Sequence, residues 1–237
     1  MPLPADIAAS LDSVRRRIHA AAHRVHRSPT DITLVAVSKT FSADHVRAAF
    51  SCDQRVFGEN RVQEAVAKQA ELQGLPLEWH LIGHLQSNKA RKAVTTFTCL
   101  QSVDRMDLLV KLDAAAGETG MRPRILLQVD LAGEATKHGA GRDALGDLAR
   151  AAVDSRHLQL NGLMLVPPNP DTAESSRPWF RQLRELRDDL VASGLPADAL
   201  RDLSMGMSHD FEVAIEEGAT MVRVGTSIFG HRDYTAA

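Results

Sequence analysis

The hexapeptide 34–39, Leu-Val-Ala-Val-Ser-Lys, delivers one amine to the end of an apolar run. Its aliphatic and β-branched residues predict a buried strand with Lys39 at the carboxyl end. A lysine amine that is desolvated at such a place can attack a carbonyl carbon and form a Schiff base. A lysine whose charged end simply reaches into solvent is the more common outcome for this hexapeptide alone. The rest of the chain must therefore decide between the two interpretations.

A second group of residues could hold a phosphate. Gly225 and Thr226 stand between a predicted strand and a helical turn, where backbone N–H groups and a hydroxyl can contact an anion. Ser204 and Ser208, at the end of another predicted strand, could add hydroxyls, and Ser208 is also predicted to be the N-cap of the next helix. Ordinary turn and cap chemistry explains these residues equally well. Phosphate binding is therefore a hypothesis that depends on Lys39 lying nearby.

Three further polar residues have simpler explanations. Asn60 precedes Gln63 by three residues, a pattern typical of a capping-box variant at a helix start. His80 and His84 flank Gly83 at a predicted strand exit and share no helical face, so we predict no metal site. The sequence also lacks the common nucleophile, zinc-protease, phosphate-loop and dinucleotide-binding motifs.

Composition narrows the function classes. The 237 residues include 28 basic and 30 acidic side chains, a net charge of −2, which gives no electrostatic footprint for nucleic acid or anionic membranes. No apolar run approaches the length that crosses a bilayer, and the first residues lack the pattern of a signal peptide. The sequence has two cysteines, Cys52 and Cys99, and this low number favours a reducing compartment. We expect a cytoplasmic protein with no nucleic-acid or membrane partner.

Strand and helix patterns alternate after an amphipathic helix over residues 5–26. The predicted strands are 32–37, 55–57, 78–82, 96–103, 124–131, 158–165, 202–205 and 221–224. Eight strands in this length predict an α/β fold, a single (β/α)8 TIM-type barrel with an extra N-terminal helix, in which residues 1–237 form one domain. Because strands 55–57 and 202–205 are short, an open doubly wound sheet is the alternative. Lys39 and Gly225 become neighbours only in the closed barrel.

Several long motifs occur in a characteristic order. They are Leu34-Val-Ala-Val-Ser-Lys39, Phe57-Gly-Glu-Asn60, Trp79-His-Leu-Ile-Gly-His-Leu-Gln-Ser-Asn-Lys89, Ser102-Val-Asp104, Gly162-Leu-Met164, Leu203-Ser-Met-Gly-Met-Ser208 and Arg223-Val-Gly-Thr226. On these motifs the chain closely resembles the pyridoxal 5'-phosphate homeostasis protein family. These are small barrel proteins related to the N-terminal domain of alanine racemase. The resemblance spans nearly the whole sequence.

The resemblance implies a cytoplasmic barrel that carries pyridoxal 5'-phosphate (PLP) as a Schiff base on Lys39. It places the phosphate at Ser208, Gly225 and Thr226, and Arg223 opposite the pyridine nitrogen. The cofactor-binding residues that we expect are Lys39, Asn60, His80, Ser204, Ser208, Arg223, Gly225 and Thr226.

The resemblance further implies a monomer that buffers PLP or delivers it to apo forms of PLP-dependent enzymes, with effects on vitamin B6 and amino-acid balance. An arginine at the pyridine nitrogen disfavours ring protonation and weakens the ring as an electron sink. Tyr234 is the single tyrosine, and no second domain follows the predicted barrel, so we expect an open site without robust catalysis. The alternatives are a PLP-dependent amino-acid racemase or decarboxylase-like enzyme, and a binding barrel that has lost its ligand.

Overall fold

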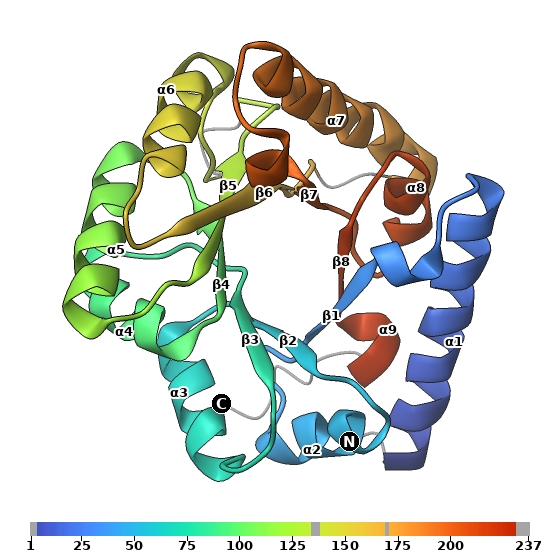
Figure 1. The fold of residues 1–237 in the computed structure, drawn as a ribbon. Helices are drawn as coiled ribbons and strands as arrows, with labels where there is room; N and C mark the ends of the chain where they lie inside the picture. Colours follow the sequence, from blue (N-terminus) through green and yellow to red (C-terminus); the bar gives the residue numbers. More distant parts are fainter. Residues whose placement is uncertain (1–3, 134–137, 169–170, 231–237) are drawn as a thin grey trace.

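The computed structural model describes residues 4–133, 138–168 and 171–230 of the chain. Eight parallel strands form one closed barrel in which spatial order follows sequence order from β1 to β8 (Figure 1). Strand β8 pairs with β1 and closes the ring, with Val224 beside Ala36. The predicted (β/α)8 barrel is therefore confirmed, and the open doubly wound sheet is excluded.

The strands are β1 Thr33–Val37, β2 Val56–Glu59, β3 Glu78–Leu81, β4 Cys99–Val103, β5 Arg124–Val129, β6 Gln159–Leu165, β7 Asp202–Ser204 and β8 Met221–Val224. The two weakly patterned strands, β2 and β7, both exist and are hydrogen bonded on both sides. Even a three-residue strand has two neighbours in a closed barrel, and this explains how so short a segment is retained.

The α-helices are α1 Pro4–Arg24, α2 Ala43–Ser51, α3 Val62–Glu71, α4 Ala90–Thr96, α5 Met106–Thr119, α6 Arg142–Val153, α7 Arg177–Ala192, α8 Phe211–Glu216 and α9 Thr226–Phe229. Short 3-10 turns occupy Pro29–Asp31, Ser87–Lys89, Ala173–Ser176 and Ala197–Leu200. No helix among the described residues has both the length and the apolar composition needed to span a membrane.

The largest error in a predicted boundary lies before β4. The sequence predicts the fourth strand over residues 96–103, but α4 continues to Thr96 and β4 begins at Cys99. Ala90, Ala93 and Val94 lie buried on one side of α4, which is the spacing of a helix face. The hydroxyl of Thr96 donates to the carbonyl of Lys92 at 2.7 Å and so accommodates a β-branched residue at the helix end.

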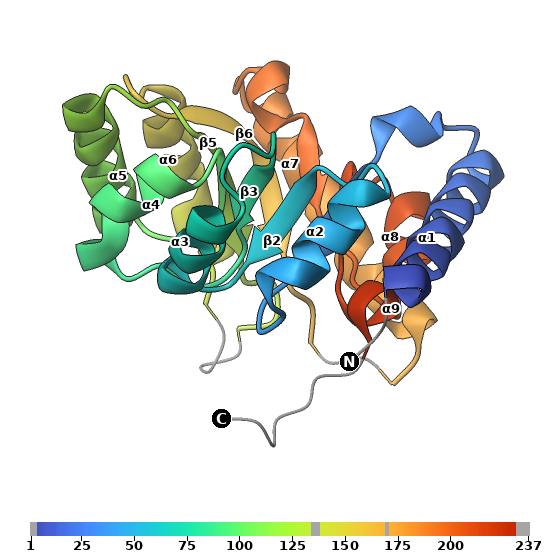
Figure 2. The same cartoon turned by 90° about the horizontal axis from the view of Figure 1, so that it is seen from below.

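The predicted N-terminal helix is confirmed and packs outside the barrel beside α2, α8 and α9 (Figures 1 and 2). Ile7, Leu11, Val14 and Ile18 recur every three or four residues and are buried along one face of α1. Two ion pairs join this helix to α8, Arg17 with Glu212 and Arg24 with Glu216. Arg17 donates two hydrogen bonds to Glu212 at 2.7 and 2.9 Å, which is the strongest arrangement available to such a pair.

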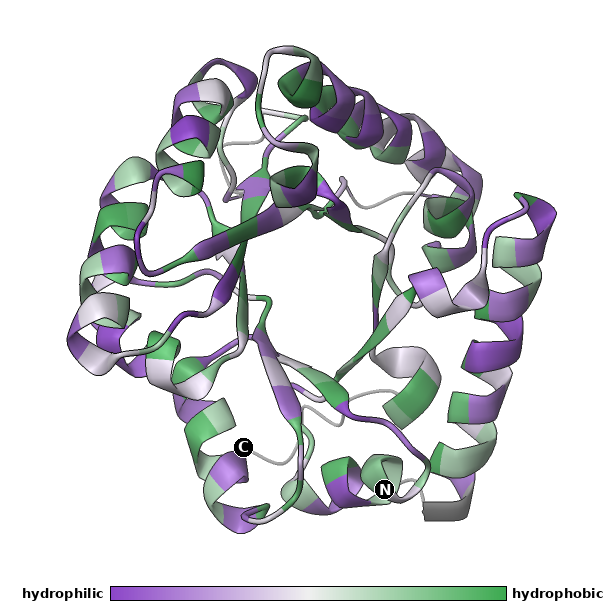
Figure 3. Ribbon diagram, in the orientation of Figure 1, coloured by the Kyte–Doolittle hydropathy of each residue, from purple (hydrophilic) through white to green (hydrophobic). Residues whose placement is uncertain are grey.

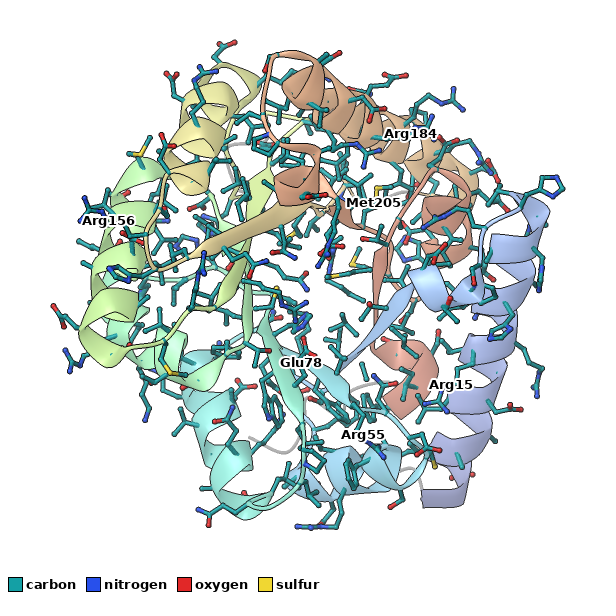
Figure 4. The ribbon with its side chains drawn as sticks, in the orientation of Figure 1. Arg15, Arg55, Glu78, Arg156, Arg184 and Met205 are labelled. Carbon is teal, nitrogen blue, oxygen red and sulfur yellow. The ribbon has the colours of Figure 1, made fainter. Side chains whose placement is uncertain are left out.

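Apolar residues fill the layer between the barrel and its helices. Figure 3 shows α7 as largely hydrophilic with recurring hydrophobic positions, and its buried residues are Phe180, Leu183, Leu186 and Leu190. The interior of the barrel differs from this layer because several of its buried side chains are polar. Side chains from the strands reach into the centre of the ring, which looks open in the ribbon (Figure 4).

Candidate functional site

A pocket of about 420 Å³ opens at the carboxyl ends of the strands. In barrels of this kind the loops at that end carry the functional residues. The pocket is lined by Val37, Lys39, Asn60, Ile82, Val166, Met207, Ser208, His209, Arg223, Gly225 and Thr226. Six of the eight residues expected from the sequence therefore share one pocket. The closure of β8 against β1 brings Lys39 and Gly225 together.

Lys39 sits on a tight turn just after β1, two residues beyond the last residue of the strand. Thr40 adopts a φ of +70°, which is uncommon for a β-branched residue. Two hydrogen bonds hold the turn: Phe41 N donates to Ser38 O at 3.0 Å, and Thr40 N donates to Glu64 at 3.3 Å. Lys39 is thus fixed through its backbone at the edge of the pocket.

A buried ion pair lies directly under this turn. Glu59 Oε1 accepts hydrogen bonds from Ser38 Oγ at 2.6 Å and from Lys68 Nζ at 2.5 Å. Lys68 Nζ also donates to the carbonyl of Ser38 at 2.7 Å. Burial raises the pKa of Glu59, while Lys68 opposes the shift. Both groups therefore hold the residue that precedes Lys39.

Sequence reasoning missed this pair, although one signal was present. Lys68 occupies a position on the inner face of α3 that the spacing of Val62, Ala65 and Leu72 marks as buried. A lysine at a core position requires a partner, because an isolated buried charge is costly. The partner, Glu59, comes from the end of β2.

Arg223 forms a buried wall of the pocket, with only 4% of its surface exposed. Its Nη1 donates to Ser204 Oγ at 2.7 Å and its Nη2 to the carbonyl of Leu165 at 2.8 Å. Both acceptors are neutral. Burial lowers the pKa of Arg223 to about 10, partly opposed by the charge of Asp210, so the guanidinium remains charged at neutral pH. Its remaining N–H donors suit an acceptor supplied by a ligand.

The part of the pocket at the start of α9 carries small residues and backbone amides. Ser208 Oγ accepts from the backbone N–H groups of Gly225 at 3.2 Å and Ser227 at 3.3 Å. A Cβ atom at Gly225 would lie only 3.2 Å from the carbonyl oxygen of Val37. Glycine therefore lets the backbone approach β1 closely and leaves room beside Thr226.

Ser208 does not have the cap role predicted for it. The N-cap of α8 is Asp210, and the Asp210 carboxylate accepts from Met207 N at 2.7 Å. The prediction failed because the turn 207–210 points the Ser208 hydroxyl to the start of α9 instead. The capping-box explanation for Asn60 also fails: Arg61 is the N-cap of α3 and no side-chain cap is formed. Asn60 lines the pocket instead.

His80 and Ser204 lie beneath the pocket and do not line it. Ser204 contacts Arg223 and also donates to Gln101 Oε1 at 2.6 Å. Gln101 Nε2 lies 2.8 Å from His80 Nδ1. Both predicted residues therefore reach the pocket only through Arg223. Gln101 was missed because a glutamine inside a strand carries no motif.

His84 meets Asp104 and His138 rather than His80. The His84 and His138 rings are stacked, with centroids 3.6 Å apart and planes 15° from parallel, and His84 Nδ1 lies 3.6 Å from Asp104. Ring nitrogen lone pairs lie in the ring planes, so those of two nearly parallel rings do not converge on one ion. His84, Asp104 and His138 nevertheless offer ligand atoms that lie within 4.8 Å of one another, so the absence of a metal stays a prediction.

The pocket fits a flat heteroaromatic aldehyde that carries a phosphate. Lys39 supplies an amine, Arg223 supplies a buried donor for a ring nitrogen, and the start of α9 supplies hydroxyls and a glycine for close approach. This combination defines a class of protein, the PLP-binding barrels. Comparison with known proteins agrees, because the family profile described as alanine racemase, N-terminal domain, matches residues 9–233.

Two curated relatives and one solved structure place the chain more narrowly. The pyridoxal phosphate homeostasis protein of Pseudomonas aeruginosa is 44% identical over 231 residues, which is 97% of each chain. That of Aquifex aeolicus is 42% identical over 224 residues, 94% of this chain and 97% of the relative. PipY of Synechococcus elongatus, solved with PLP bound, gives a TM-score of 0.84 at 43% identity over 94% of this chain and 100% of PipY. The chain belongs to the pyridoxal phosphate homeostasis protein family.

Complete alanine racemases are more distant. The Clostridium difficile enzyme gives a TM-score of 0.71 at 15% identity, over 97% of this chain and 58% of the enzyme. At this identity the likeness shows the shared fold alone.

Proposed function

We propose that this protein binds PLP covalently through Lys39 and acts in PLP homeostasis as a store or carrier of the cofactor. The proposal rests on one observation: Lys39 lines the same pocket as the buried Arg223, whose hydrogen-bond acceptors in the protein are neutral. When bound, PLP supplies an aldehyde that condenses reversibly with amines. PipY, a relative of similar length, has been solved with PLP bound.

Each pocket residue has a proposed task. Lys39 holds the aldehyde carbon, and the Ser38–Glu59–Lys68 contacts fix the backbone from which it extends. Ser208, Gly225 and Thr226 hold the phosphate, and Arg223 donates to the ring nitrogen. Asn60 forms the wall near β2. His80 and Ser204 support Arg223 from below.

The pocket supports a carrier better than a racemase or decarboxylase-like enzyme. Among the described residues that line it, Lys39, His209 and Arg223 are titratable, and none is a tyrosine or a carboxylic acid. An enzyme of either kind needs a positioned proton donor or acceptor on the substrate. Arg223 also keeps a positive charge where ring protonation would otherwise strengthen the electron sink.

The wider proposal concerns the whole chain. We propose that residues 1–237 form a single domain that works as a monomer in the cytoplasm. Its partners are PLP and apo-enzymes that require it.

Transfer of PLP is tested by mixing the PLP-loaded protein with such an apo-enzyme. The rate of reactivation is compared with the rate given by free PLP at the concentration that the loaded protein releases spontaneously. Reactivation no faster than by free PLP contradicts delivery.

The test of covalent binding is absorbance of the PLP-loaded protein, followed by borohydride reduction and peptide mapping. We expect the reduced pyridoxyl group on Lys39 and its loss in Lys39→Ala. Lys89→Ala is the matched control, because Lys89 follows β3 at the same end of the barrel but does not line the pocket. Label found mainly on Lys89 or Lys137 would overturn the assignment. Residue 137 lies outside the described residues.

A further inference from the structure

A continuous chain of side-chain hydrogen bonds crosses the barrel interior and ends at Arg223. Its members, taken from the pocket downward, are Arg223, Ser204, Gln101, His80 and Glu78 (Glu78 is labelled in Figure 4). The successive distances are 2.7, 2.6, 2.8 and 2.9 Å. The four members from Arg223 to His80 are buried. Four different strands contribute residues to this series of hydrogen bonds.

Arg223 dictates the direction of its first bonds. A guanidinium can only donate, so Ser204 Oγ accepts and must use its single proton toward Gln101. The oxygen of the Gln101 amide therefore faces Ser204, and its NH₂ group faces His80. Weak contact of Gln101 Nε2 with the Met221 sulfur at 3.8 Å agrees with that orientation.

The far end agrees with the same direction. His80 Nδ1 accepts from Gln101, so neutral His80 carries its proton on Nε2 and donates to Glu78 Oε1. Burial lowers the pKa of His80, although Glu78 opposes this, which favours the neutral ring. Glu78 also accepts from Arg124. Every bond thus donates away from the pocket, from a cation at one end to a carboxylate at the other.

We propose that Ser204, Gln101 and His80 are positioning residues that fix Arg223 as a donor toward the nitrogen of a bound heteroaromatic ring. This inference rests on the proposed PLP binding. A flipped Gln101 amide would take away the acceptor for the Ser204 proton. A neutral His80 protonated on Nδ1 would face the Gln101 NH₂ group with a second donor and Glu78 with a lone pair, so the hydrogen bonds favour one arrangement of Arg223. The carbonyl of Leu165 holds the second guanidinium nitrogen. Together these contacts set the orientation of the group at the pocket wall.

The experiment compares the dissociation constants of PLP and of its analogue with C–H in place of the ring nitrogen. The wild-type protein is expected to prefer PLP by about tenfold, the effect of one hydrogen bond to a charged group. Gln101→Met removes the hydrogen bonds to Ser204 and His80 with little change in side-chain volume. It should lower the preference for PLP to about twofold or less. A merely structural role of Gln101 would weaken both ligands equally and leave the ratio unchanged.

Two further variants sharpen the result. Gln101→Glu keeps an acceptor for Ser204 and is expected to retain the preference for PLP. Cys99→Ala is the control, because Cys99 is equally buried on the same strand but outside the chain. A preference lost equally in Cys99→Ala, or retained in Gln101→Met, would overturn the inference.

Nitrogen-15 NMR of the wild-type protein tests the direction of the chain without any variant. We expect His80 protonated on Nε2 alone at pH 8, and protonated on both nitrogens in Gln101→Glu. The Nδ1-protonated neutral tautomer would overturn the proposed direction. Failure of wild-type protein to attach PLP to Lys39 would instead reject the proposed function, so the two failures are distinguishable.

Discussion

Two buried cations flank the pocket, and their surroundings differ. Lys68, under the Lys39 turn, is paired with the carboxylate of Glu59 at 2.5 Å. Arg223 has only a hydroxyl and a carbonyl as hydrogen-bond partners among the described residues. A buried charge that is hydrogen bonded to an opposite charge within the protein serves the fold, whereas one that is hydrogen bonded to neutral groups alone suits a ligand. Lys68 thus supports the site from within the protein, whereas Arg223 is suited to contact a ligand.

The largest expected effect is on the paired cation. Lys68→Met leaves Glu59 buried without a counter-charge and should lower the free energy of unfolding by about 3–5 kcal/mol. Urea unfolding of the protein without PLP measures this. The double variant Lys68→Met/Glu59→Gln should recover most of the loss, because the unpaired charge is gone. A double variant that is no more stable than Lys68→Met would contradict the assignment of this pair.

Arg223→Met should change the stability of the protein little and its affinity for PLP strongly. Removing a cation that is hydrogen bonded to no carboxylate should cost the PLP-free protein about 1–2 kcal/mol. Two hydrogen bonds to neutral acceptors are lost, while the nearby Asp210 keeps its own hydrogen bonds from Ser176 and Met207. Affinity for PLP should fall about tenfold or more. Thermal unfolding with and without PLP measures both. A loss of PLP-free stability as large as that of Lys68→Met would remove the distinction between the two cations.

The pH dependence of stability provides a finer test. Glu59 has a pKa raised above its ordinary value of 4.5, so the folded state binds the proton more tightly than the unfolded chain. Its contribution is therefore most favourable below pH 4.5 and is lost as the pH rises through the folded-state pKa. In Lys68→Met this loss should steepen, giving lower stability at pH 8 than at pH 5. Adding Glu59→Gln should remove most of the difference in stability between pH 5 and pH 8. A difference that persists in the double variant would come from another titrating group.

The smallest expected effect concerns the phosphate end. Thr226→Ala should weaken PLP binding by about tenfold, the effect of one hydrogen bond to a charged group, and should leave pyridoxal nearly unaffected. Thr226→Ser keeps the hydroxyl and is the matched control. Equal losses for both ligands would place the phosphate elsewhere in the pocket.

Much of the site follows from local patterns. The run that ends at Lys39 and the Arg223-Val-Gly-Thr226 segment are each contiguous, so strand period and turn chemistry indicate where their residues stand. Alternation of strands and helices then predicts that both segments reach one rim. The boundary of β4 was wrong because Thr96 has strand-forming character, while burial of Ala93 and Val94 favours helix.

The sequence by itself thus determined the barrel, the strand-end lysine and the glycine-containing loop, because each depends on residues close together in the chain. Only the tertiary structure decided that Lys68 pairs with Glu59, that the Ser208 hydroxyl accepts hydrogen bonds from the start of α9, and that Ser204 contacts Gln101. Ser204 and Gln101 are separated by 103 positions. Such partners meet because ring closure and strand register turn particular side chains inward, and a buried polar group must then find its hydrogen bonds there.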